Sequence, residues 1–154
     1  KMAITTAMCN SFKQELLGGV HDLDTDTIKI ALIKVSHSGT YGAATTNYSD
    51  LTGATDEAVG TNYTAGGQGL DVPNDEGSSI ISLDTGNNTA FLNFRDEVFA
   101  NLTISAVGAI IYNSSKSNKA IALFDFGGTV TSTSGDFTIV FPAAAHNTAV
   151  VRIT

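Results

Sequence analysis

The chain lacks tryptophan and has one cysteine and two prolines among its 154 residues. A single cysteine, Cys9, cannot form an internal disulfide, so packing must hold the core together. A globular chain of this length buries roughly 68–70 % of its unfolded surface, which is enough for one domain without cross-links or metals. No catalytic motif surrounds Cys9, and we expect it to be a small buried side chain.

Charged residues are also scarce, at 15 % of the chain against the roughly 25 % that is usual. The 15 acids outnumber the 8 bases, which gives a net charge of −7. This balance disfavours nucleic acid and anionic membranes as partners, because both need clustered Lys and Arg. No apolar run approaches the roughly 20 residues that span a bilayer, and no secretory signal is recognisable at the N-terminus.

One helix is predicted, at about residues 6–17. Its apolar side chains recur at i, i+4 and i+8 and form a stripe of Met8, Phe12 and Leu16. Thr5 or Thr6 is the expected N-cap, and Gly18-Gly19 is a ready stop.

The rest of the chain has the pattern of strands. Residues 28–33 alternate with a period of two, which predicts a strand with one buried face. Residues 102–112 are apolar on both faces and predict a central strand. A hairpin is expected, with strands at 80–83 and 90–94 around a turn at 86–88. Two further strands are expected at 119–126 and at 136–141, separated by a turn region at 127–135, and the second of them has Phe137, Ile139 and Phe141 on one face. A last short strand is expected at the C-terminal end. The prediction is a single mainly β domain over 1–154, an antiparallel β-sandwich of jelly-roll or immunoglobulin-like type with a short N-terminal α-helix.

The pattern fails between about residues 36 and 79, which are rich in Gly, Thr, Ser and Asn. So long a weakly patterned segment is unusual inside a compact domain. We predict either a functional loop or a stretch that neighbouring subunits order. Its three tyrosines can anchor it by burial of their rings: Tyr41, Tyr48 and Tyr63.

Three carboxylates stand at alternate positions before the first strand: Asp22, Asp24 and Asp26. An EF-hand loop that began at Asp22 would need Gly at position 27 and Glu at position 33, where the chain has Thr27 and Ile33. An irregular calcium site stays open. A connector is favoured, because Asp supports turns by bonding its own backbone.

The remaining polar residues do not form a recognisable site. The histidines His21, His37 and His146 lack zinc-ligand spacing, and the adjacent pair Asp96-Glu97 is a poor glycosidase dyad. The segment TAGGQG, residues 64–69, lacks the Lys-Ser/Thr of a phosphate loop, so tight turns or close backbone packing explain its glycines. We therefore expect no enzyme activity, and no catalytic, cofactor-binding or metal-binding residues.

Six stretches in order carry a resemblance over nearly the whole chain: SFKQELL, HDLDTDTIKIALIK, NYTAGGQGL, AVGAIIYN, KAIALFDFGG and GDFTIVFPAA. Together they resemble small virion structural proteins of tailed bacteriophages of the marine and cyanobacterial type. The resemblance implies a β-sandwich without catalytic residues, assembled in the host cytoplasm and found in the virion.

The same resemblance implies a role as a capsid decoration or cement protein. The expected partners are the major capsid protein or other virion proteins, and a homo-oligomer is expected, with a trimer favoured. A neck, tail or fibre-base protein is the first alternative. A carbohydrate-binding or receptor-binding sandwich is the second, with the loop tyrosines stacking on sugar rings.

Overall fold

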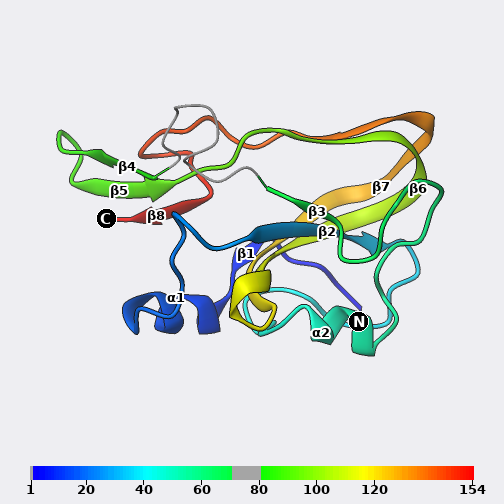
Figure 1. The fold of residues 1–154 in the computed structure, drawn as a ribbon, viewed down its shortest axis with the longest axis horizontal. Helices are drawn as coiled ribbons and strands as arrows, with labels where there is room; N and C mark the ends of the chain where they lie inside the picture. The colour runs from blue at the N-terminus through cyan, green and yellow to red at the C-terminus, as the bar shows by residue number, and fades with distance from the viewer. Residues whose placement is uncertain (1, 71–80) are drawn as a thin grey trace.

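The computed structural model describes residues 2–70 and 81–154 and confirms a mainly β fold with two antiparallel sheets and a short N-terminal helix (Figure 1). The elements are β1 (Ala7–Met8), α1 (Asn10–Leu17), β2 (Ile28–Lys34), α2 (Ser49–Gly53), β3 (Gln68–Gly69), β4 (Ile81–Asp84), β5 (Thr89–Leu92), β6 (Glu97–Asn113), a 3-10 turn (Ser114–Lys116), β7 (Lys119–Ile139) and β8 (Val151–Ile153). The larger sheet has the order β1-β7-β6-β2-β3, and the smaller has the order β4-β5-β8.

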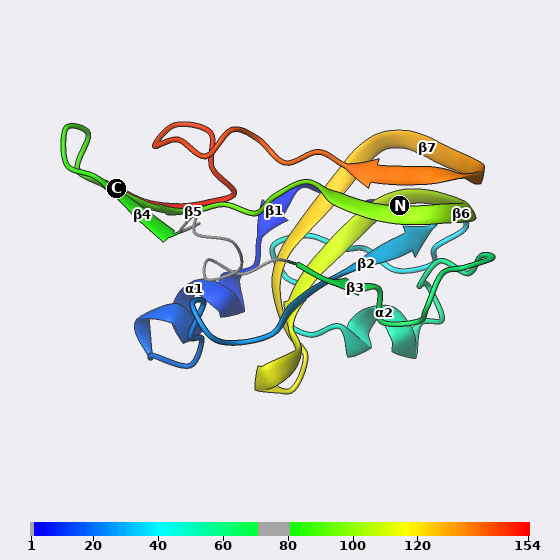
Figure 2. The same cartoon turned by 45° about the horizontal axis from the view of Figure 1, so that its top comes forward.

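The β6–β7 hairpin dominates the fold, and it bends back on itself (Figures 1 and 2). Its two ends differ in role. The end near the 3-10 turn lies in the middle of the large sheet, while the Glu97 end of β6 runs in the opposite direction over that sheet (Figure 2). Register shifts interrupt the pairing between Phe99 and Leu102 and again between Leu102 and Ile104. Such bulges bend a strand pair, so they account for the curvature.

The predicted turn region at 127–135 is wrong, because β7 continues through it as one strand. Gly108 of β6 pairs with Asp125 and Ala106 pairs with Val130, so β7 has more residues than β6 across this interval. The extra residues form a bulge that includes Gly127, whose φ of 75° suits glycine. The glycines therefore mark an irregularity within the strand and not its end.

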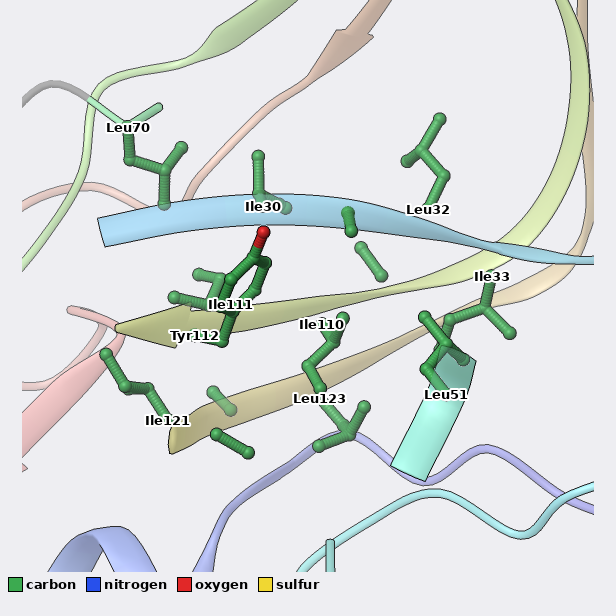
Figure 3. Packing of buried hydrophobic residues seen from close by; sticks show 14 of the residues in the cluster. Ile30, Leu32, Ile33, Leu51, Leu70, Ile110, Ile111, Tyr112, Ile121 and Leu123 are labelled. Carbon is green, nitrogen blue, oxygen red and sulfur yellow. The ribbon is translucent and has the colours of Figure 1, made fainter. Parts of the chain in front are cut away.

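Strand β2 is buried on both faces, whereas the sequence predicted one buried face. Figure 3 shows Ile30 and Leu32 on one side of the strand and Ile33 on the other, next to Leu51 of α2. All four side chains are fully buried. The prediction failed because residues 36–70, which have no apolar period, cover the second face.

The N-terminal helix begins at Asn10, four residues later than predicted, and Cys9 is its N-cap in place of Thr5 or Thr6. The preceding residues pair with β7 as β1, and the Cys9 amide donates to the carbonyl oxygen of Ile121 at 2.9 Å. Sheet pairing has thus replaced the first helical turn. The helix ends at Leu17 with Gly18 as its C-cap, as predicted, and Phe12 is its fully buried residue.

The segment that was predicted as a loop at 36–79 contains α2 and β3, and its residues 71–79 lie outside the described ranges. Polar anchors hold it against the large sheet. The buried carboxylate of Asp56 accepts from the Tyr41 hydroxyl at 2.7 Å and from the amides of Ser38 and Gly39 at 2.8 Å each. Its ion pair with Lys34 ties the segment to β2.

The predicted hairpin around residues 86–88 is confirmed: β4 pairs with β5 from Ile81–Leu92 to Asp84–Thr89. Ile80, which was assigned to its first arm, lies outside the described residues. The predicted C-terminal strand is β8, and it pairs with β5 to complete the small sheet.

Candidate functional site

Of the three carboxylates before β2, only Asp26 is buried. Its Oδ2 accepts from the Asn113 amide at 2.7 Å and from the Asp22 backbone amide at 2.9 Å, and Lys116 lies 3.3 Å from its Oδ1. Burial acts to raise the pKa of Asp26, but these hydrogen bonds and the Lys116 charge outweigh it and lower the pKa. Asp26 is thus a structural anchor of the connector.

The other two acids, Asp22 and Asp24, lie in an ordinary turn. Asp22 is exposed, and its Oδ1 accepts from the Asp24 amide at 3.2 Å, as an Asp in a turn commonly does. Over residues 2–70 and 81–154, no group of three or more His, Cys, Asp and Glu is placed to hold a metal ion.

His21 shares the partner Asn113 with Asp26, and its side chain is fully buried. We call this set of polar contacts the junction. The Asn113 amide donates to its Nδ1 at 3.0 Å, so its Nε2–H donates to Glu15 at 3.0 Å. Lys119 pairs with the same Glu15 carboxylate. The junction connects α1, the connector and the turn between β6 and β7. Sequence reasoning missed the role of Asn113 because its partners are about ninety residues away.

The two other histidines have separate partners. His37 Nδ1 lies 2.9 Å from the Gly39 carbonyl oxygen, and His146 pairs with Asp84 at 3.1 Å beside the β4–β5 turn. The Asp96 carboxylate accepts from the Phe141 amide at 2.9 Å. The structure therefore does not bring these predicted candidates together.

The loop tyrosines are engaged by the core and do not form an open platform. Tyr41 is buried against Asp56, and Tyr48 stacks on Tyr112 with ring centroids 4.5 Å apart. The hydroxyls of Tyr48 and Tyr63 both donate to Glu57. Burial, and after it the Glu57 carboxylate, raises the pKa of Tyr48 and holds the phenol protonated.

An open apolar cavity of about 410 Å³ lies along β7, and we call it the β7 groove. The bend of β7 brings its residues 124–130 and the chain at 137–142 to the same cavity. The lining residues are Thr6, Phe124, Asp125, Phe126, Val130, Phe137, Thr138, Ile139, Val140, Phe141 and Pro142.

Aromatic contacts join the two walls of the β7 groove. The rings of Phe124 and Phe141 meet edge to face at 6.1 Å, and those of Phe126 and Phe137 lie 6.1 Å apart. Val130 and Val140 remain 42 % and 72 % exposed, so the apolar surface continues to the solvent. The sequence predicted a shared face for Phe137 and Phe141, but the groove depends on the bend, which no local pattern showed.

A second apolar cavity, of about 370 Å³, lies between the end of α1 and the small sheet. Leu16 and Leu23 line one side of it, and Phe91 and Val151 line the other. Leu83 and Ile153 of the small sheet are 66 % and 56 % exposed.

Comparisons with protein-family models, with curated proteins and with solved structures found no match. Arguments about function therefore depend on the residues and their geometry. Among the helices of the described ranges, none has the length and apolar character that a membrane crossing requires.

Proposed function

We propose that this chain is a non-enzymatic structural component of a tailed-phage virion, and specifically a capsid decoration or cement protein that stabilises the shell. The observation that carries the proposal is the β7 groove, an open apolar surface with Val130 and Val140 at its rim. Apolar surface left open on a soluble fold is typical of a site that another protein covers. The phage assignment itself comes from the sequence resemblance.

Two further properties support a part that assembles with others. The fold is held without disulfides, as a protein that matures in a reducing cytoplasm requires, and Cys9 is buried. The net charge of −7 favours docking onto a basic surface of a shell protein. Both properties also suit the alternative of a neck, tail or fibre-base protein.

A carbohydrate-binding or receptor-binding sandwich is the less favoured alternative, because it depended on exposed tyrosines. Tyr41 is buried, and Tyr48 and Tyr63 have their hydroxyls bound to Glu57. A titration of the labelled protein with glycans, followed by NMR, tests it: shifts at Tyr48 or Tyr63 would favour sugar binding over a purely structural role.

The copy number of the chain in purified virions tests the main proposal. Quantitative mass spectrometry against the major capsid protein should give a ratio near one, or a simple fraction of it, if the chain decorates the shell. A handful of copies per particle would indicate the neck, tail or fibres instead. Absence from virions would refute the structural role.

We also propose that the chain forms a homo-oligomer, most simply a trimer. The exposed apolar side chains Leu83 and Ile153 of the small sheet favour self-association over a monomer. Light scattering on the purified protein should give three times the chain mass of 16.0 kDa. A mass of one chain at micromolar concentration would contradict this part of the proposal.

A further inference from the structure

We infer that the β7 groove receives an extended segment of another virion protein, one that alternates apolar side chains and carries Lys or Arg, and that this segment lies along β7 where β1 ends. The partner's identity rests on the proposed function. The chemistry of the segment follows from the edge of β7, the walls of the groove and its charge.

The first argument is the backbone edge of β7. On the side away from β6, the described residues of β1 pair with β7 only at Ala122 and Leu123. The Thr6 hydroxyl then accepts from the Asp125 amide at 3.0 Å and ends the pairing. A strand edge that runs on past its neighbour is a template for another chain.

The chain before β1 does not continue along this edge, because it turns away to the segment of α2. The Thr5 amide donates to the Tyr41 carbonyl oxygen at 2.9 Å, and the Tyr41 amide donates to the Ala3 carbonyl oxygen at 2.9 Å. Past Asp125, no strand of the described residues lies on this side of β7. The groove therefore starts where the chain itself leaves the edge.

The second argument is the shape and chemistry of the walls. Four phenylalanines line the groove, and their contacts in pairs join residues 124–126 of β7 to residues 137–141. An extended segment presents alternate side chains to one face, so its apolar residues enter the groove while the intervening ones remain in solvent. Aromatic walls give each inserted apolar side chain a large contact area.

The third argument is charge. The lining of the groove contains Asp125 and no Lys, Arg or His, and the Asp96 carboxylate lies at its border through its bond to the Phe141 amide. A basic segment is attracted to this border. At this acidic border, a basic segment of another protein is a better electrostatic complement than a second copy of this chain, whose net charge is −7.

The test uses purified protein and two short fluorescent peptides that alternate valine and threonine. One peptide carries lysine at each end, and the other carries glutamate. We expect the lysine peptide to bind at least about tenfold more tightly by fluorescence anisotropy, with weaker binding at higher salt.

A matched pair of variants assigns the binding to the groove. The double variant Val130→Ser/Val140→Ser removes exposed apolar side chains from the groove, and Val59→Ser removes one that is 91 % exposed elsewhere. Both should melt like wild type, since surface changes usually alter stability by less than about 0.5 kcal/mol. We expect at least about tenfold weaker binding in the double variant and no change in Val59→Ser.

Three outcomes would overturn the inference. The first is equal binding of the two peptides, and the second is unchanged binding by the double variant. The third is a wild-type oligomer that becomes a monomer in the double variant, because the occupant would then be a second copy of this chain. None of them bears on the copy number in virions, so this inference can fail while the proposed function stands.

Discussion

At the scale of single residues, the acids that looked like a metal site are distinguished by burial. Asp26 accepts hydrogen bonds from Asn113 and Asp22 in the interior, while Asp22 itself is exposed and makes a turn contact with Asp24. These contacts fit the connector interpretation, although that interpretation missed the anchoring role of Asp26. That role needs Asn113, which no local spacing indicates.

Asp26→Asn should lower the free energy of unfolding at pH 7 by about 1.5–3 kcal/mol, because hydrogen bonds to a charged group are lost. The pKa of Asp26 in the folded protein lies below its ordinary value of 3.8, so the carboxylate stabilises the fold above that pH. The difference between wild type and variant should therefore close as the pH falls below about 4. Urea titrations at several pH values measure it. Asp22→Asn is the control, since an Asn oxygen can still accept from the Asp24 amide. A melting temperature that rises with calcium in the wild type but not in Asp26→Asn would contradict the role of Asp26 as a structural anchor.

Cys9 should be inert towards thiol reagents in the native protein. Burial, followed by the negative charge of Asp50, raises the pKa of Cys9 to about 12, so almost no thiolate exists at pH 8. Labelling with a chromogenic disulfide should be slow without denaturant and fast with it. Rapid labelling of the native protein would show that the start of α1 opens.

At the scale of elements, the sequence predicted those whose side chains follow a simple period. The central strand at 102–112, the hairpin around 86–88 and the helix stop at Gly18 are all present. The segment at 36–70 could not be predicted, because individual polar contacts that follow no period hold it, such as those of Asp56 with Tyr41 and Lys34. The β7 groove was equally hidden, since it arises from bulges that only the paired strands show.

Phe12→Ala should cost about 3–5 kcal/mol, because it leaves a cavity under α1. Phe12 is fully buried and its ring centroid lies 5.0 Å from that of His21. Leu17→Ala in the same helix is the control, since Leu17 is 91 % exposed and should change stability by less than about 0.5 kcal/mol. Equal melting temperatures for the two variants would mean that α1 does not pack as described.

Gly67→Ala should destabilise the protein, while Gly69→Ala should not. An added Cβ at Gly67 would lie 1.8 Å from the Ile30 carbonyl oxygen, and its φ of 70° costs a side chain roughly 1–2 kcal/mol in addition. At Gly69 the nearest atom would be 4.0 Å away. Urea unfolding of both variants measures the difference, and equal stability would refute the close approach of this segment to β2.

At the scale of the whole molecule, the segment at 36–70 and the sheet share one interior. Leu51 and Tyr41 are buried with the residues of β2, and Lys34 pairs with Asp56. The segment is therefore expected to unfold together with the sheet. This expectation differs from the alternative prediction, in which the segment becomes ordered only against neighbouring subunits.

Chemical unfolding should consequently show one transition by two probes. The chain has no tryptophan and four tyrosines, three of which lie at 41, 48 and 63, so tyrosine emission reports mainly on this segment. Far-UV circular dichroism reports on the sheets. Coincident midpoints indicate a single cooperative unit; earlier loss of the tyrosine signal would show that the segment detaches first.

The β6–β7 hairpin has a consequence for the order of folding. Its strands are joined by the short 3-10 turn at Ser114–Lys116, so their pairing closes only a small loop at the start and can then extend residue by residue. By contrast, β1 pairs with β7 from the other end of the sequence, and β2 pairs with β6 across about half of the chain. Local contacts form fastest, so we expect the hairpin to form early and the N-terminal half to assemble on it later.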